Sequence, residues 1–324
     1  MIKLLKLLLI CIIPLLMAAC NNTQAILPVD GSADWKDQNM HPSVLHFPDQ
    51  WNGYEFWMAY SPYPNSNAYY ENPCVAASHD GINWITPAGL VNPLEKVSDQ
   101  EFKDGYHYSD PELVMVNGIL ECWFRFNKNG DQEWLFRKTS SNGINWSNTE
   151  LVMDLSGTGN WALSPSVIYE DGKYKLWFCG LNNSIYYTES PTGHPDTWSP
   201  PVETPLSFRD AQWAAWHLDV LKDHDKYILI MNTMPDENGR RFLTAGESLD
   251  GFSFSDIHLI LSPGVGATEW DNKMLYRAST VRIGDLYSML YSAKSVEGKW
   301  HIGVAQGNSL DSLSKIGGTW CKFR

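Results

Sequence analysis

Short runs of apolar and aromatic residues alternate with turns rich in Gly, Pro, Asn and Asp along most of this chain. A polar residue repeatedly opens a run of β-branched or aliphatic residues, as in His41-Pro-Ser-Val-Leu. A turn then leads to an aromatic run such as Tyr54-Glu-Phe-Trp-Met. Runs of this length, bounded by turn residues, are typical of β-hairpins. Because no sustained heptad or helical stripe appears, the pattern excludes a helical bundle.

The hairpin pattern occurs five times. The polar residues that open the five units are His41, Asp110, Ser164, His217 and Arg277. These starts lie 69, 54, 53 and 60 residues apart, and a third strand follows the hairpin in every unit. Roughly 50 to 60 residues with three or four strands is the size of one propeller blade. We therefore predict an all-β fold, a single five-bladed β-propeller over residues 35–324, with its ring closed by residues 30–40 or 318–324.

The first residues form a separate segment. Lys3 and Lys6 stand at the start of the largely apolar stretch that runs to residue 16, and Met17-Ala18-Ala19 stands directly before Cys20. Basic residues, a short apolar run and small residues in this order are typical of an export signal. We expect residues 1–19 to be a signal peptide, Cys20 to be lipidated as in a bacterial lipoprotein, and residues 20–34 to form a tether. Simple secretion with cleavage nearby is the alternative.

The predicted location is therefore that of an exported bacterial lipoprotein associated with the outer membrane. It would contact the membrane only through its lipid anchor. The 37 acidic residues outnumber the 24 basic ones and give a net charge of −13, so the chain lacks the basic face that nucleic acid binding needs. We expect a monomer that acts on carbohydrate.

Four cysteines lie in the predicted propeller, and their spacing matches no zinc-binding pattern. They are Cys74, Cys122, Cys179 and Cys321. Cys122 and Cys179 stand inside strand-like runs, where a lone cysteine is usually a small buried apolar residue. Disulfide pairing among the four stays open. No metal ligand or required cofactor is predicted, and a structural cation held in the channel by water and carboxylates is left open.

The repeat also predicts what lines the central channel, because the first strand of each propeller blade faces the axis. The five opening residues form one ring. Residues two positions further along point to the same side of each strand and form a deeper ring. Its members are Ser43, Glu112, Ser166, Asp219 and Ser279. Carboxylates, imidazoles and a guanidinium gathered in a narrow channel are candidates for acid and base chemistry; bracing the blades is the alternative role.

Further candidates lie around one mouth of the channel. Trp213 and Trp216 precede the fourth first strand, Tyr108 precedes the second, and Glu71 ends a loop of the first unit. Aromatic faces stack on sugar rings, and an indole or phenol adds a hydrogen bond at its edge. Together with His41 and Arg277, these four residues are predicted to bind substrate.

Five blades of this length, with Asp110-Pro111 or a similar pair opening first strands, resemble the five-bladed glycoside hydrolases of families 43, 32 and 117. The resemblance covers the whole predicted propeller and implies its architecture. It does not extend to the catalytic triad of family 43, whose positions correspond here to His41, Ser164 and about Trp216. The chain is therefore similar to a divergent branch of these enzymes.

The resemblance implies glycoside hydrolysis, which commonly needs one protonated acid and one ionised carboxylate. Asp110 or Glu112 paired with Asp219 is the predicted set, with His217 tuning Asp219 or serving as the acid. The alternative from another class is a carbohydrate-binding propeller without catalysis. A third hypothesis, a sialidase-like enzyme, comes from Ser78-His-Asp-Gly-Ile-Asn-Trp84, which resembles an Asp-box.

Overall fold

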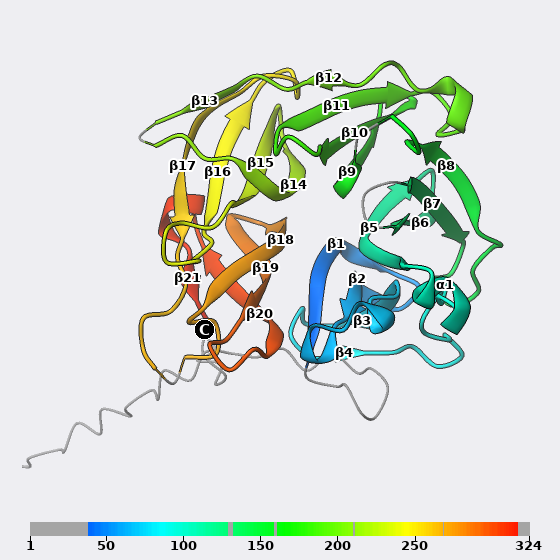
Figure 1. Ribbon diagram of the computed structural model, residues 1–324, viewed down its shortest axis with the longest axis horizontal. Helices are drawn as coiled ribbons and strands as arrows, with labels where there is room; N and C mark the ends of the chain where they lie inside the picture. Colours follow the sequence, from blue (N-terminus) through cyan, green and yellow to red (C-terminus); the bar gives the residue numbers. More distant parts are fainter. Residues whose placement is uncertain (1–37, 129–131, 159–160, 210, 268, 317–324) are drawn as a thin grey trace, which may run out of the picture.

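The computed structural model describes residues 38–128, 132–158, 161–209, 211–267 and 269–316. Five sheets stand around a central axis, and the chain passes through them in order (Figure 1). The predicted all-β, five-bladed propeller is confirmed. The predicted signal peptide, the tether with Cys20, Cys321 and the segment 318–324 lie outside the described residues.

Each blade is a meander of antiparallel strands. The first two blades consist of β1 (Asn39–Trp51), β2 (Tyr54–Pro62), β3 (Cys74–Ser78), β4 (Trp84–Ile85), then β5 (Tyr106–Val116), β6 (Ile119–Lys128), β7 (Gln132–Ser140) and β8 (Glu150–Asp154). The third consists of β9 (Leu163–Glu170), β10 (Lys173–Cys179), β11 (Ile185–Ser190) and β12 (Val202–Glu203). The fourth holds β14 (Ala215–Asp223), β15 (Lys226–Thr233), β16 (Leu243–Ser248) and β17 (Phe254–Leu261), with β13 (Leu206–Phe208) parallel to β17. The last holds β18 (Met274–Ile283), β19 (Leu286–Lys294), β20 (Trp300–Gly307) and β21 (Ser314–Lys315).

Helical structure is confined to short segments between strands. They are α1 (Asp99–Lys103) and the single-turn 3₁₀ helices η1 (Pro64–Ser66), η2 (Ala68–Tyr70), η3 (Pro195–Thr197) and η4 (Leu310–Ser312). Within the described ranges, no helix is both long and apolar enough to span a bilayer.

The innermost strands close the ring. They are β1, β5, β9, β14 and β18, and β1 contacts both β5 and β18. Each sheet is built from strands that are consecutive in the chain, so the described part shows no blade shared between the two chain ends. Apolar side chains fill the space between neighbouring blades, where Trp57, Trp123 and Trp177 are fully buried.

The three described cysteines of the propeller belong to this core. Cys74, Cys122 and Cys179 are buried free thiols. The expectation that Cys122 and Cys179 act as small apolar residues is confirmed, because both pack within interblade apolar clusters.

The Asp-box-like segment is a turn that joins the third and fourth strands of a blade. Ser78 Oγ accepts the Gly81 N–H at 3.0 Å, and Asp80 Oδ1 accepts the Asn83 N–H at 2.7 Å. Ser140 and Ser248 open turns of the same design in the second and fourth blades. Its side chains are thus engaged in local backbone bonds, which gives the motif a structural role.

Candidate active site

Every innermost strand carries a β-bulge where its opening residue lies. The pairing register breaks beside His41, Asp110, Ser164, His217 and Arg277. At the first three, the backbone is left-handed, with φ of 55°, 49° and 54°, and a proline follows each. A bulge turns a side chain away from its regular direction, and a left-handed non-glycine residue costs about 1–2 kcal/mol. The strained backbone positions are therefore the ones at which the side chains of first strands turn toward the channel axis.

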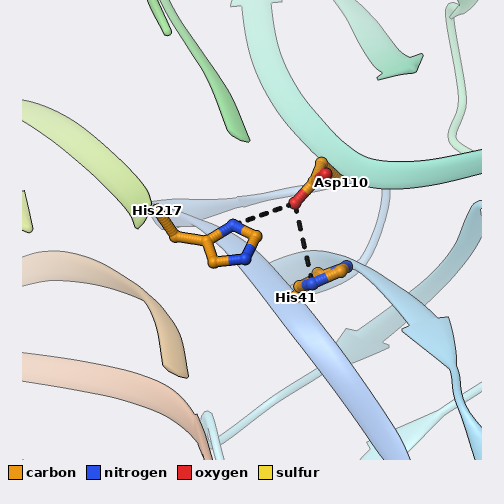
Figure 2. Close-up of side chains that lie close together, drawn as sticks. All are labelled: His41, Asp110 and His217. Carbon is orange, nitrogen blue, oxygen red and sulfur yellow. Dashed lines mark ion pairs between the residues drawn. The ribbon is translucent and has the colours of Figure 1, made fainter. Parts of the chain in front are cut away.

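The bulges bring three of these side chains together at one end of the channel (Figure 2). His217 Nδ1 lies 3.2 Å from Asp110 Oδ1, and His41 Nε2 lies 3.6 Å from the same oxygen. One potential ligand atom of each residue lies within 4.8 Å of the others. All three side chains are at most 2% exposed, so bulk water does not solvate them.

The same three side chains have polar atoms that no protein group satisfies. Apart from the 3.2 Å approach of His217 Nδ1 to Asp110 Oδ1, that oxygen and the ring nitrogens of His41 and His217 have no hydrogen-bond partner of regular geometry among the described residues. Buried polar atoms are almost always paired, so such a group of atoms needs an explanation such as a bound ion. Two imidazoles and one carboxylate are a common ligand set for divalent transition metals.

The protonation states of the three residues also suit a metal. Burial is the main cause that lowers the pKa of His217 to about 4, and it lowers the pKa of His41 well below its usual range. Burial alone would raise the pKa of Asp110, but the imidazoles and the Arg125 guanidinium hold it well below the ordinary value. At neutral pH the site thus presents neutral imidazoles and an ionised carboxylate, the forms that bind metals.

Asp110 is held in place from the next strand. Arg125 Nη1, on β6, donates to Asp110 Oδ2 at 2.9 Å and to Ser109 Oγ at 3.0 Å. The other side of the guanidinium forms a two-pronged pair with Glu133, with distances of 2.6 and 3.0 Å. Arg125 therefore fixes one carboxylate oxygen, while the other faces the two histidines and lies 4.0 Å from Arg277 Nη1.

Glu71 supplies a second carboxyl group on the other side of His41. Its Oε1 lies 3.4 Å from His41 Nδ1, and the residue is 5% exposed. Burial and the charge of Asp110 raise the pKa of Glu71 well above the usual range, which outweighs the opposing effect of Arg125. Glu71 consequently holds its proton more strongly than an ordinary glutamate and lies beside a carboxylate whose pKa is lowered.

Glu71, Asp110 and His217 line a cavity of about 420 Å³. Tyr63, Trp161, Trp216 and Tyr276 add aromatic surface to its walls. Trp216 Nε1 donates to Tyr276 Oη at 2.8 Å. Polar groups reach it from His107 and Asn127 of the second blade. Besides Glu71, Asp110 and His217, the lining includes Met40, Tyr63, Arg125, Trp161, Trp216 and Tyr276.

Arg277 forms the floor beneath these groups. Its guanidinium donates to the carbonyls of Pro111 and Pro165, both at 3.0 Å, and to Glu112 Oε2 at 2.7 Å. It is 1% exposed. Since Arg277 crosses the channel from blade five to blades two and three, it separates the cavity above from another of about 400 Å³ at the opposite mouth.

The deeper ring links the blades by hydrogen bonds. Each member accepts the backbone N–H that follows the corresponding member of a neighbouring blade. The bonds are Ser43 Oγ to Leu113 N, Glu112 Oε1 to Val167 N, Ser166 Oγ to Val220 N, Asp219 Oδ2 to Thr280 N, and Ser279 Oγ to Val44 N, at 2.9–3.3 Å. The five bonds form a closed circuit around the axis.

Two residues of this ring are titratable. Burial is the main cause that raises the pKa of Glu112 to about 8 and that of Asp219 to about 6, against the opposing charge of Arg277. Both face the opposite mouth of the channel, below the Arg277 floor. The structure therefore separates Glu112 and Asp219 from the cavity that holds Asp110 and His217.

The predicted substrate-binding residues divide into two groups. His41, Glu71 and Trp216 contribute to the site around Asp110, with Arg277 beneath it. Tyr108 lies elsewhere: it is 8% exposed and packs against Phe124 and Phe126 in the core between blades one and two. Trp213 lines a different cavity.

Several residues of the site escaped the sequence prediction. Arg125 and Asn127 lie on a second strand, β6, whereas the repeat in the sequence places only first strands at the channel. Tyr276 stands directly before the predicted Arg277 and stacks on His41 with a ring distance of 5.6 Å. Its place in a first strand is the signal that could have found it. His107, in the aromatic segment before the second first strand, does line the cavity.

Comparison with known proteins gives relatives of one general kind. No protein-family model matches the chain. An A type blood N-acetyl-alpha-D-galactosamine deacetylase from Flavonifractor plautii is 26% identical over 300 residues. The match covers 76% of this chain but 38% of that protein, so the chain spans well under half the length of this curated relative.

Solved structures share the architecture. An N-acetylgalactosamine deacetylase from F. plautii, in complex with blood group B trisaccharide, superposes with a TM-score of 0.74 and 22% identity, covering 88% of this chain and 95% of that one. An exo-1,5-alpha-L-arabinanase from a bovine ruminal metagenomic library superposes with a TM-score of 0.62 and 11% identity. The match covers 91% of this chain and 98% of that one. A GH43_1 enzyme from Xanthomonas citri, complexed with xylose, superposes with a TM-score of 0.63 and 11% identity. The match covers 91% of this chain and 94% of that one. The predicted resemblance to family 43 is confirmed for the fold, and these relatives are carbohydrate-active enzymes.

Proposed function

We propose that this protein is a metal-dependent deacetylase that hydrolyses the amide of an N-acetylated amino sugar at the end of a glycan. The observation that carries the proposal is the buried trio of His41, Asp110 and His217 with its unpaired ligand atoms. The matched relative is named as a deacetylase of N-acetylgalactosamine, which supports this choice of reaction.

The three residues would hold a divalent ion through the imidazole nitrogens and Asp110 Oδ1. When bound, such an ion polarises an acyl oxygen and lowers the pKa of a water molecule. In the reaction, water supplies one oxygen of the released acetate, the C–N bond breaks, and the amine nitrogen takes up a proton. We assign delivery of that proton to the neutral Glu71 carboxyl, which regains one from the attacking water.

The surrounding residues would hold the sugar and exclude water. Trp161, Trp216 and Tyr276 offer aromatic faces to a sugar ring. Asn127 and His107 supply polar groups on another wall of the cavity. Arg125 acts through Asp110, whose orientation and charge it maintains.

Acetate release from a trisaccharide with terminal α-linked N-acetylgalactosamine tests the proposal, together with the metal content of the purified protein. We expect about one equivalent of divalent metal, loss of activity on chelation and recovery when metal is added back. His217→Ala should lose both metal and activity, whereas His224→Ala, which changes a histidine with a 75% exposed side chain, should keep both. Full activity in metal-free wild type would overturn the proposal.

A second candidate function is glycoside hydrolysis. It is favoured by the pair of a protonated Glu71 and an ionised Asp110 in one cavity, since glycosidases use carboxyl groups whose pKa values are pushed apart. Product analysis separates the candidates, because a glycosidase releases free sugar while a deacetylase releases acetate and leaves the glycan intact. Binding of glycan without either product would indicate the carbohydrate-binding alternative.

We also propose that the protein is exported and attached to a membrane by a lipid on Cys20, and that it acts as a monomer. The basic, apolar and small-residue order of residues 1–19 supports the first part. An amino-sugar deacetylase in that location would meet glycans outside the cytoplasm.

A further inference from the structure

A second and larger cavity lies where blades three and four meet. It measures about 750 Å³. Its walls come from the turn between β10 and β11, the link from β12 to β13, and the segment that enters β14. The residues that matter here are Asn183, Ser184, Thr204, Phe208, Gln212 and Trp213.

This cavity lies beside the central one, at the same end of the blades. Trp213 lines the second cavity and Trp216 lines the first. Three residues of chain span at most about 11 Å, a distance that a short oligosaccharide bridges. The Ala215 N–H also donates to the Asn183 carbonyl at 3.1 Å, so the wall of the second cavity is joined directly to the strand that carries His217.

The chemistry of the walls suits a neutral, hydroxyl-rich ligand. Trp213 and Phe208 are half-buried and provide aromatic surface, whereas Asn183, Ser184 and Gln212 provide uncharged polar groups. Among the described lining residues, Glu203 alone carries charge, and its carboxylate already accepts a hydrogen bond from Ser184 Oγ at 2.7 Å. An anionic ligand would find no opposite charge here, and the one carboxylate is already bonded to Ser184.

Thr204 gives independent support for a ligand. It is 3% exposed, and its Oγ1 has no hydrogen-bond partner among the described residues. Its backbone is fixed by a 2.8 Å bond from its N–H to the Ile185 carbonyl, so the side chain has a defined position. A buried hydroxyl without a partner costs free energy unless a ligand or water completes its bonding.

We propose that this cavity binds the neutral sugar units that follow the terminal amino sugar, so that the protein recognises an oligosaccharide and not a single residue. Trp213 stacks on one of these units, and Thr204 Oγ1 bonds to a sugar hydroxyl. The inference rests on the proposed deacetylase function, which sets the end of the glycan in the central cavity.

Two substrates test it. One is the trisaccharide with terminal α-linked N-acetylgalactosamine, and the other is the methyl α-glycoside of N-acetylgalactosamine alone. Loss of one aromatic stacking partner corresponds to a roughly two- to tenfold loss of affinity for the stacked sugar. Trp213→Ala should raise KM for the trisaccharide by that factor and leave kcat and KM for the methyl glycoside unchanged. Phe252→Ala, a half-buried aromatic of the same blade, serves as the matched control.

Thr204→Val adds a variant that keeps the shape of the side chain. Because the hydroxyl has no protein partner, the melting temperature should not fall, while KM for the trisaccharide should rise several-fold. Equal KM for the trisaccharide in wild type, Trp213→Ala and Thr204→Val would overturn the inference but leave the deacetylase proposal intact. A wild type that releases no acetate from either substrate overturns the deacetylase proposal and this inference with it.

Discussion

Arg125 Nη1 donates to Asp110 Oδ2 at 2.9 Å, while Oδ1 of the same carboxylate faces the two histidines. The guanidinium thus fixes the carboxylate without occupying the oxygen that a metal would need. Groups that hold a metal ligand in this way typically contribute 10- to 100-fold to metal affinity or activity.

Arg125→Lys should therefore weaken metal binding by about 10- to 100-fold, because a lysine keeps the charge but not the fork that joins Asp110 and Glu133. Titration of the metal-free protein measures this directly. Arg282→Lys changes an arginine that pairs with Asp223 at 2.8 Å away from the site and is the control. Unchanged affinity in Arg125→Lys would contradict the assigned role.

The circuit of hydrogen bonds in the deeper ring predicts an effect on stability alone. Ser279→Ala removes the acceptor of the buried Val44 N–H, which should cost about 1–3 kcal/mol. The melting temperature should fall by about 2–10 °C while KM stays at the wild-type value. Ser255→Ala, on an exposed position of β17, should change neither. A changed KM with an unchanged melting temperature would refute the bracing role.

Substitutions at Asp219 and Glu112 distinguish a catalytic role of these residues from a structural role in linking the blades. If either were an acid or base in the reaction, its removal would lower the rate by about 10²–10⁴-fold. Because both lie below the Arg277 floor, we expect Asp219→Asn and Glu112→Gln to lose less than about tenfold in kcat and to unfold more easily. Asp110→Asn should abolish activity. Inactive but fully stable Asp219→Asn would support the original assignment of Asp219 as a catalytic carboxylate.

The buried histidines make the metal-free protein sensitive to acid. His217 has a pKa of about 4 in the fold, against about 6.5 in an unfolded chain. Between these values the unfolded state binds more protons, so stability falls as the pH is lowered from about 6.5 to about 4, by up to about 3 kcal/mol. Above about pH 6.5, where His217 is neutral in both the folded and the unfolded state, this loss of stability is absent.

Urea unfolding at several pH values measures this contribution. Glu71, Glu112 and Asp219 have raised pKa values and contribute in the opposite direction, so the comparison must be made against a variant. The difference in unfolding free energy between wild type and His217→Gln should shrink with acidification. His224→Gln, at a histidine with a 75% exposed side chain, is the control for the substitution itself. A constant difference for His217→Gln would show that this histidine titrates normally.

The N-terminal proposal has its own test. Mass spectrometry of the mature protein from a bacterial host should find residues 1–19 removed and a lipid on Cys20. Cys20→Ala should abolish the modification, and Cys321→Ala should leave it in place. Discovery of an unmodified mature chain that begins near this position would favour simple secretion.

The fold was accessible from the sequence because each blade restarts the same pattern of strands and turns. The opening residues His41, Asp110 and His217 could be assigned to one ring for the same reason. Their separation from Glu112 and Asp219 could not, since it depends on Arg277 crossing the channel to reach the Pro111 and Pro165 carbonyls. No local pattern reveals a contact between blades five, two and three.

The remaining differences have local causes. His107 and Tyr108 pair regularly with the second strand, before the bulge at Asp110, so their side chains point to opposite faces of β5. His107 therefore reaches the cavity, whereas Tyr108 packs in the core. Arg125 and Trp161 come from a second strand and from a connection between blades, and the repeat assigns neither of them to the channel.

The Arg277 floor also bears on the kind of polymer that this protein can handle. With the passage through the ring blocked, a glycan cannot thread from one face of the molecule to the other. The glycan has to enter and leave through the same mouth of the channel. Under the proposed function, every part of a glycan that reaches Asp110 therefore approaches from the face that bears Glu71 and Trp216.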